Sequence, residues 1–338
     1  MKNKLSIKQI ADLSGVSSAT VSRVINHNGR FSEKTRQKVL KVIQDNHYQI
    51  NIVAKSLRTQ KSYTVGILVP DITNSFFAQL VQKIESYLFE KGYSSIICNT
   101  ARSAVKESEY LKILTSKMVD GLILISGAKT LKNQAISTNI PVIYIDRQPA
   151  SSKSIFISSD HYKGAVLATQ HLLKEVERIC FIAQGSHSSS AAERLKGFED
   201  TVAKAVDIDS RVLDLLDYRQ GEKLERERIT SFVNREFAFL RPSQRLGIFA
   251  NNDGLAINVL AAVHNLGLKI PEQVAIIGFD DSPMARLSYP QLTTVRQDID
   301  LLAATACDKL LLVIKGKKLA NEDAVTKLPV ELILRATA

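Results

Sequence analysis

The sequence predicts an α/β protein that has a small all-α head, at residues 1–48, and a large body of two doubly wound lobes. Through Lys61 there are twelve Lys/Arg and only three Asp/Glu, so +9 of the chain's net charge of +11 lies in this segment. Short segments with apolar residues at helical spacing fill the head. From Thr64 onward, short apolar runs alternate with amphipathic helical segments, which is typical of parallel sheets covered on both faces.

The head is expected to hold three helices with a tight turn between the first two. Ser6 can cap the first helix and Gly15 can end it. A second helix is predicted from about Ser17 or Ser18 to Asn26, and Ser32 can cap a third. Two short helices joined by such a turn present the second helix to the major groove of DNA.

On the second helix, the residues that are not needed for a core are short or basic. Short side chains let the helix approach base edges, and an arginine can pair with a guanine or a phosphate. The predicted DNA-binding residues of this helix are Ser18, Ala19, Ser22, Arg23 and Asn26. A helical bundle with a solvated basic face is the simpler alternative.

Residues 49–62 are predicted to form a hinge helix and linker. About eight residues, from Asn51 to Arg58, are too few for a stable helix in water, so this helix should order only when DNA or a partner segment supports it. Lys55 and Arg58 could reach phosphates, and Ala54 is small. Leu57 is expected to wedge into a minor-groove base step, although it could instead pack on the body.

In the body, residues 63–338, we expect a ligand at the carboxyl ends of the strands. The expected strands are Thr64–Val69, Ser94–Cys98, Gly121–Ile125, Val142–Ile145, Arg178–Ala183, Leu246–Ala250, Val274–Phe279, Thr293–Arg296 and Leu328–Leu334. Aromatic, carboxylate, guanidinium and amide side chains follow these strands, a mixture that suits sugars because ring faces stack on aromatics while hydroxyls need polar partners. The candidate binding residues are Asn74, Phe76, Phe77, Asp146, Arg147, Ser190, Arg194, Asn252, Asp280 and Gln297.

No pattern predicts an enzyme, a metal site or a cofactor. Three cysteines are spaced far apart, so we expect buried thiols in a reducing cytoplasm rather than disulfides or metal ligands. His161, His171 and His187 share no metal-binding spacing and are expected to be solvated or structural. Neither a signal peptide nor a membrane span is evident, so we expect a cytoplasmic protein without membrane partners.

Three motifs resemble the LacI/GalR family of bacterial transcription regulators. They are IKQIADLSGVS at 7–17, TVSRVIN at 20–26 and AKSLR at 54–58; Ile50 departs from the family, which usually has proline there. The resemblance implies a body like that of type I periplasmic binding proteins. It places 63–160 and 293–318 in one lobe, 161–292 and 319–338 in the other, and crossings near 159–161, 289–293 and 317–321.

The family likeness further implies a homodimer that binds a palindromic operator and represses a sugar uptake or catabolic operon. The candidate binding residues resemble a ribose-like pentose site. Another sugar, a sugar acid, a nucleobase or a phosphorylated carrier-protein corepressor remain alternatives. Whether the effector is an inducer or a corepressor stays open at this stage.

Overall fold

The computed structural model describes residues 5–25, 28–48, 61–126, 140–148, 154–184, 188–215, 222–317, 319 and 324–338. The chain divides into two compact units, Met1–Ser62 and Tyr63–Ala338, which we describe separately. The predicted hinge helix lies outside the described residues.

The first unit contains the three predicted helices, α1 (Ile7–Ser14), α2 (Ser18–Ile25) and α3 (Glu33–Asp45). Ser6 caps α1 through a reciprocal bond pair with Gln9, and Gly15 ends it at a φ of 62°, a left-handed conformation that glycine adopts without strain. The helices enclose a small core, which consists of Ile10, Ala11, Val21, Val24 and Val39.

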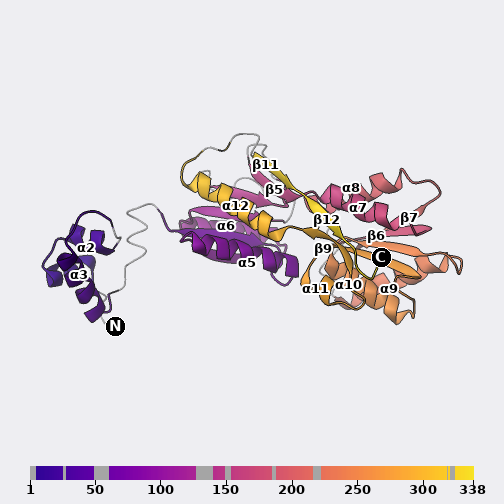
Figure 1. Cartoon of the computed structure of the whole chain (residues 1–338), viewed down its shortest axis with the longest axis horizontal. Helices are drawn as coiled ribbons and strands as arrows, with labels where there is room; N and C mark the ends of the chain where they lie inside the picture. The colour runs from indigo at the N-terminus through magenta and orange to yellow at the C-terminus, as the bar shows by residue number, and fades with distance from the viewer. Residues whose placement is uncertain are drawn as a thin grey trace. The chain divides into compact units, whose positions relative to one another are not determined.

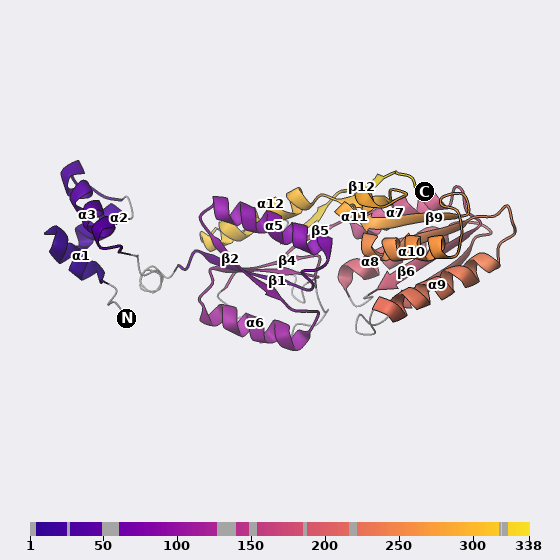
Figure 2. The same cartoon turned by 90° about the horizontal axis from the view of Figure 1, so that it is seen from below.

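In its described residues, the second unit contains two six-stranded sheets, each covered by helices on both faces (Figure 1). The first sheet is parallel throughout, in the order β2-β1-β3-β4-β5-β11. Its strands are β1 (Thr64–Val69), β2 (Ser94–Asn99), β3 (Gly121–Ile125), β4 (Val142–Ile145), β5 (Ile155–Ser159) and β11 (Val325–Leu328). Helices α5 (Ser75–Glu90) and α12 (Ile299–Ile314) cover one face and α6 (Ala104–Ser116) covers the other, as Figure 2 shows.

The second sheet has the order β7-β6-β8-β9-β10-β12, and only β12 runs antiparallel to its neighbour. Its strands are β6 (Arg178–Gln184), β7 (Asp209–Leu215), β8 (Leu246–Ala250), β9 (Val274–Asp280), β10 (Thr293–Gln297) and β12 (Val330–Ile333). Its helices are α7 (His161–Leu172), α8 (Ser189–Val202), α9 (Glu222–Ala238), α10 (Asp253–Asn265) and the short α11 (Pro283–Leu287). No helix in the described ranges is long and apolar enough to cross a membrane.

Two of the three expected crossings between the lobes are wrong. The chain crosses after β5, as expected, but β10 pairs with β9 in the second sheet, so the next crossing follows Gln297 and not residues 289–293. The third lies at Pro329, because β11 pairs with β5 and β12 pairs with β10. Proline has no N–H for a ladder, and the single strand expected at Leu328–Leu334 is instead two short strands in different sheets. Among the described residues, lobe 1 therefore comprises those within 63–159 and 299–328, and lobe 2 those within 161–297 and 330–338.

Candidate functional site

The head carries a shallow hollow on the face of α2 that points away from the core. Ser18, Ala19, Ser22 and Arg23 line it together with Ile7, Asn28 and Gly29, while Val21 and Val24 of the same helix are buried. The structure thus gathers four of the predicted DNA-binding residues on one surface. The others, Asn26, Ala54, Lys55, Leu57 and Arg58, lie outside the described residues.

Gly29 shapes this surface by lying against the side chain of Arg23. A Cβ atom at Gly29 would lie 3.0 Å from Cδ of Arg23, and the φ of Gly29 is +84°, which L side chains rarely adopt. The arginine itself is exposed. Gly29 therefore leaves room for the stem of Arg23, whose charged end is available to a polyanion.

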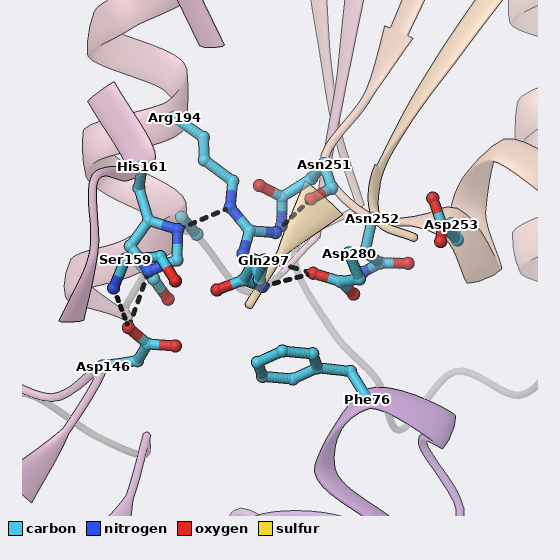
Figure 3. A network of polar contacts seen from close by, with 12 residues as sticks. Phe76, Asp146, Ser159, His161, Arg194, Asn251, Asn252, Asp253, Asp280 and Gln297 are labelled. Atoms are coloured by element: carbon cyan, nitrogen blue, oxygen red, sulfur yellow. Dashed lines mark hydrogen bonds and ion pairs between the residues drawn. The ribbon is translucent and has the colours of Figure 1, made fainter. Parts of the chain in front are cut away.

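In the body, a pocket lies where strands of both lobes end. Eight of the ten predicted ligand-binding residues line it: Asn74, Phe76, Phe77, Asp146, Ser190, Arg194, Asn252 and Asp280. Arg102, Ser126, Gln184, Ser188 and Asn251 complete the lining. In Figure 3 the ring of Phe76 lies between Asp146 of lobe 1 and Asp280 of lobe 2, so two carboxyl groups and an aromatic face border the same space.

Asn74 connects the end of β1 to the start of α5. Its side-chain oxygen accepts hydrogen bonds from the backbone N–H groups of Phe76, at 3.0 Å, and Phe77, at 3.4 Å. This N-cap fixes the two phenylalanines, whose rings meet edge to face with centroids 5.6 Å apart. Because the oxygen of Asn74 is engaged in the cap, its amide N–H groups are the part that can serve a ligand.

Asp146 directly follows β4 and is 3% exposed. Its Oδ1 accepts hydrogen bonds from the hydroxyl of Ser158 (2.8 Å), from the backbone N–H of Ser159 (3.3 Å) and from the ring of His161 (2.8 Å). Burial alone would raise the pKa of Asp146, but His161, Ser158 and the charge of Arg194 outweigh burial and lower it. Asp146 is therefore an ionised hydrogen-bond acceptor at neutral pH.

Asp280, at the end of β9, has the opposite character. Burial raises its pKa to about 8, and the nearby carboxylates Asp253 and Asp146 add to the shift, against the opposing effects of Arg194 and Gln297. The ion pair with Arg194 is long, 3.5 Å, which is why it does not offset burial. A protonated Asp280 can donate a hydrogen bond, so the pocket holds one acceptor-only acid and one potential donor.

Arg194, from α8, is almost fully buried at the centre of the polar network (Figure 3). Its Nε–H donates to Nδ1 of His161 at 3.3 Å, and a terminal nitrogen donates to the carbonyl of Asn251. The guanidinium carbon lies 3.7 Å from the ring centroid of Phe279, so the ring supports the cation from one side. The orientation of Arg194 is thereby fixed before any ligand arrives.

Three buried polar atoms beside this network have no hydrogen-bond partner among the described residues: Oε1 of Gln297, Oδ1 of Asn251 and Oγ of Ser159. Gln297 donates a hydrogen bond from Nε2 to Oδ1 of Asp280 at 2.7 Å, and this bond does not involve its side-chain oxygen. Buried polar groups are normally paired, so unpaired ones at a pocket indicate a ligand or ordered water. Gln297 itself does not line the pocket.

Arg147 does not reach the pocket, although the sequence predicted that it would. Its guanidinium forms a 2.8 Å ion pair with Glu107 of α6, and both side chains are less than a tenth exposed. Adjacent residues at the end of a strand point in different directions, so Asp146 faces the pocket while Arg147 faces the interior of lobe 1. Arg147 therefore holds α6 against the sheet of lobe 1 and does not line the pocket.

The sequence interpretation missed His161, which is fully buried between Asp146 and Arg194. It is the first residue of α7 and follows β5, a strand that had not been recognised. Applying the rule about strand ends to β5 would have found it. Among the described residues, no group of three His, Cys, Asp or Glu side chains is arranged to hold a metal ion.

Comparisons with known proteins agree with this architecture. Residues 6–51 match the family model of bacterial regulatory proteins of the lacI family, and residues 169–338 match that of the periplasmic binding protein-like domain. The chain is 33% identical to a ribose operon repressor of Bacillus subtilis, with 98% of each chain covered. It is 34% identical to a sucrose operon repressor of Pediococcus pentosaceus, and 32% identical to the transcriptional repressor PurR of Photobacterium profundum, over 100% and 97% of each chain.

Solved structures with the same fold include a lac repressor dimer bound to operator and an anti-inducer. It matches with a TM-score of 0.83 at 26% identity, over 99% of each chain. A LacI family regulator from Enterococcus faecium with bound ribose matches with a TM-score of 0.67 at 28% identity, over 81% of this chain and 98% of that one. Family models, full-length relatives and fold agree, and the chain belongs to the LacI family of bacterial transcriptional regulators.

Proposed function

We propose that the protein is a sugar-responsive repressor that binds operator DNA and regulates a sugar uptake or catabolic operon. The observation that carries the proposal is the pocket between the lobes, where Phe76, Asp146 and Asp280 border one space. An aromatic face beside fixed polar groups is the arrangement that sugars require. We place this activity in the cytoplasm, where the DNA is.

For DNA binding, we propose a homodimer whose two heads occupy the half-sites of a palindromic operator. Each α2 would enter a major groove, with Ser18, Ala19 and Ser22 at the base edges and Arg23 on a guanine or phosphate. The hinge segments would enter the minor groove between them, with Leu57 as the wedge. The net charge of +9 through Lys61 supports a salt-sensitive contact with phosphates.

For the effector, we propose an uncharged sugar, with a ribose-like pentose as the first choice. Asp146 is ionised and would repel the carboxylate of a sugar acid. Arg194 already directs its N–H groups at His161, Asn251 and Asp280, so it is not arranged as an anion clamp. The unpaired oxygen of Asn251, which lines the pocket, would accept a hydrogen bond from a sugar hydroxyl.

The effector would act by changing how the two lobes are oriented. Its contacts come from lobe 1, through Phe76 and Asp146, and from lobe 2, through Asp280 and Asn252. A ligand held by both lobes favours one relative orientation, and thereby moves the anchor points of the hinge segments. The hinge helix at residues 51–58 would then form or melt, which changes the affinity for DNA.

The test is a gel-shift series on an operator selected from random DNA by the protein itself. Ribose, other pentoses, hexoses, disaccharides and sugar acids are added in turn, and so is a phosphorylated carrier protein. We expect an uncharged sugar to change the operator affinity, and the direction of the change will show whether it is an inducer or a corepressor. A response only to a sugar acid or to the carrier protein would refute the proposed effector.

A further inference from the structure

His161 occupies a position that joins the two lobes through hydrogen bonds. It begins α7 of lobe 2, and its Nε2 lies 2.8 Å from Oδ1 of Asp146 in lobe 1. Its Nδ1 lies 3.3 Å from Nε of Arg194 on α8. The side chain is fully buried, and its ring lies beside Phe279 with centroids 5.6 Å apart.

These two contacts determine where the imidazole carries its proton. The Nε of arginine bears a hydrogen and has no lone pair to offer, so it can only donate. Nδ1 of His161 must therefore accept, and the single ring proton of the neutral form lies on Nε2. That Nε2–H donates to the carboxylate of Asp146.

The same bond orients Asp146. Three donors, from Ser158, Ser159 and His161, converge on its Oδ1. In Figure 3 the other carboxylate oxygen of Asp146 points to the side on which Phe76 lies. The shared oxygen is thus held in the protein, and the other faces the pocket.

We propose that His161 is a positioning residue: in its Nε2–H form it joins Asp146 to Arg194 across the lobes and presents Oδ2 of Asp146 to the effector. The inference rests on the proposed function, because it assigns the supporting group of that same pocket. His161 does not touch the effector and acts through its two neighbours.

The contacts of His161 also exclude the other neutral ring form. A hydrogen on Nδ1 would face the N–H of Arg194, and neither group could accept it. The charged side chains nearest to His161 are Asp146 and Arg194, with Asp280 beyond the arginine.

Two substitutions separate the contacts of His161. In His161→Gln the amide N–H reaches the place of Nε2 and keeps the bond to Asp146, whereas in His161→Asn the oxygen lies near the place of Nδ1 and keeps only the acceptor for Arg194. Without the hydrogen bond from residue 161, Asp146 is no longer held with Oδ2 toward the effector. We therefore expect His161→Asn to bind D-ribose about tenfold or more weakly, and His161→Gln to bind it nearly as the wild type does. A residue that only fills space would make the two variants alike.

Three measurements on the full-length protein decide the proposal. Nitrogen-15 NMR of the sugar-free protein, assigned with His161→Gln, should show Nε2 protonated and Nδ1 unprotonated; the opposite form overturns the proposal, whichever sugar binds. Calorimetric titration with D-ribose should show weaker binding by His161→Asn than by the wild type and by His161→Gln, and equal binding by the two variants overturns the proposal. If Asp146→Asn binds like the wild type, the proposed pocket fails; if it loses binding while both His161 variants keep it, only the role of His161 fails.

Discussion

The ion pair between Arg147 and Glu107 gives the strongest prediction about stability. The two side chains are 5% and 8% exposed, and the distance between Nη1 and Oε2 is 2.8 Å. Glu107→Ala would leave the guanidinium charge buried without this partner, which costs about 3 kcal/mol or more of the free energy of unfolding. Replacing both residues, with Glu107→Leu and Arg147→Met, removes the charge together with its partner and should cost far less.

Chemical unfolding followed by circular dichroism measures these costs, and hydrogen exchange in β3 and β4 assigns the loss to lobe 1. If Glu107→Ala costs less than about 1 kcal/mol, or the double variant costs as much as the single one, the pair is not the buried bridge described above. Sugar binding by the double variant then decides the position of Arg147. If the double variant still binds the sugar, Arg147 only supports the structure of lobe 1. If the double variant is folded but no longer binds the sugar, Arg147 contacts the effector, as the sequence predicted.

Three further predictions concern the head, the hinge and the pocket. Gly29→Ala should weaken operator binding while α1–α3 stay folded, because the new Cβ would lie 3.0 Å from Cδ of Arg23 and displace that side chain. Unchanged operator affinity in a fluorescence anisotropy titration would contradict this. Leu57→Ala should weaken operator binding about tenfold or more while sugar affinity stays the same, and equal operator affinity would refute the wedge. The carboxyl of Asp280, with its pKa raised to about 8 from 3.8, binds protons more tightly when folded, so stability should fall as pH rises between these values. Asp280→Asn should flatten that slope in thermal melts, and an unchanged slope would show that Asp280 does not cause it.

The sequence predicted the strands that are continuous apolar runs, and it failed where pairing decides the structure. Arg178–Gln184 is buried along its whole length and was recognised almost to its last residue. By contrast, β10 and β11 are short, and the sheet to which each belongs depends on its partner strand, which is β9 for β10 and β5, far earlier in the chain, for β11. Periodicity carries no information about such partners, so the crossings at Gln297 and Pro329 had to come from the structure.

At the pocket, the rule that ligands bind at strand ends was sufficient for residues such as Asp146, Arg194 and Asp280. It did not indicate which way a side chain turns. Arg147 faces Glu107, which lies forty residues earlier, and only the packing of α6 on the sheet brings the two together. Likewise, the role of His161 depends on neighbours from two lobes, which no local spacing could indicate.

The central claim is that a sugar held by Asp146 between the lobes controls the affinity of the head for DNA. The most direct test is operator binding of the wild type and of Asp146→Asn, each measured by fluorescence anisotropy with and without the sugar that acts in the gel-shift series. The variant keeps the size of the side chain and leaves the head untouched. We predict equal operator affinities without sugar, a change on adding sugar in the wild type, and none in the variant. An equal sugar response in both proteins would contradict the claim.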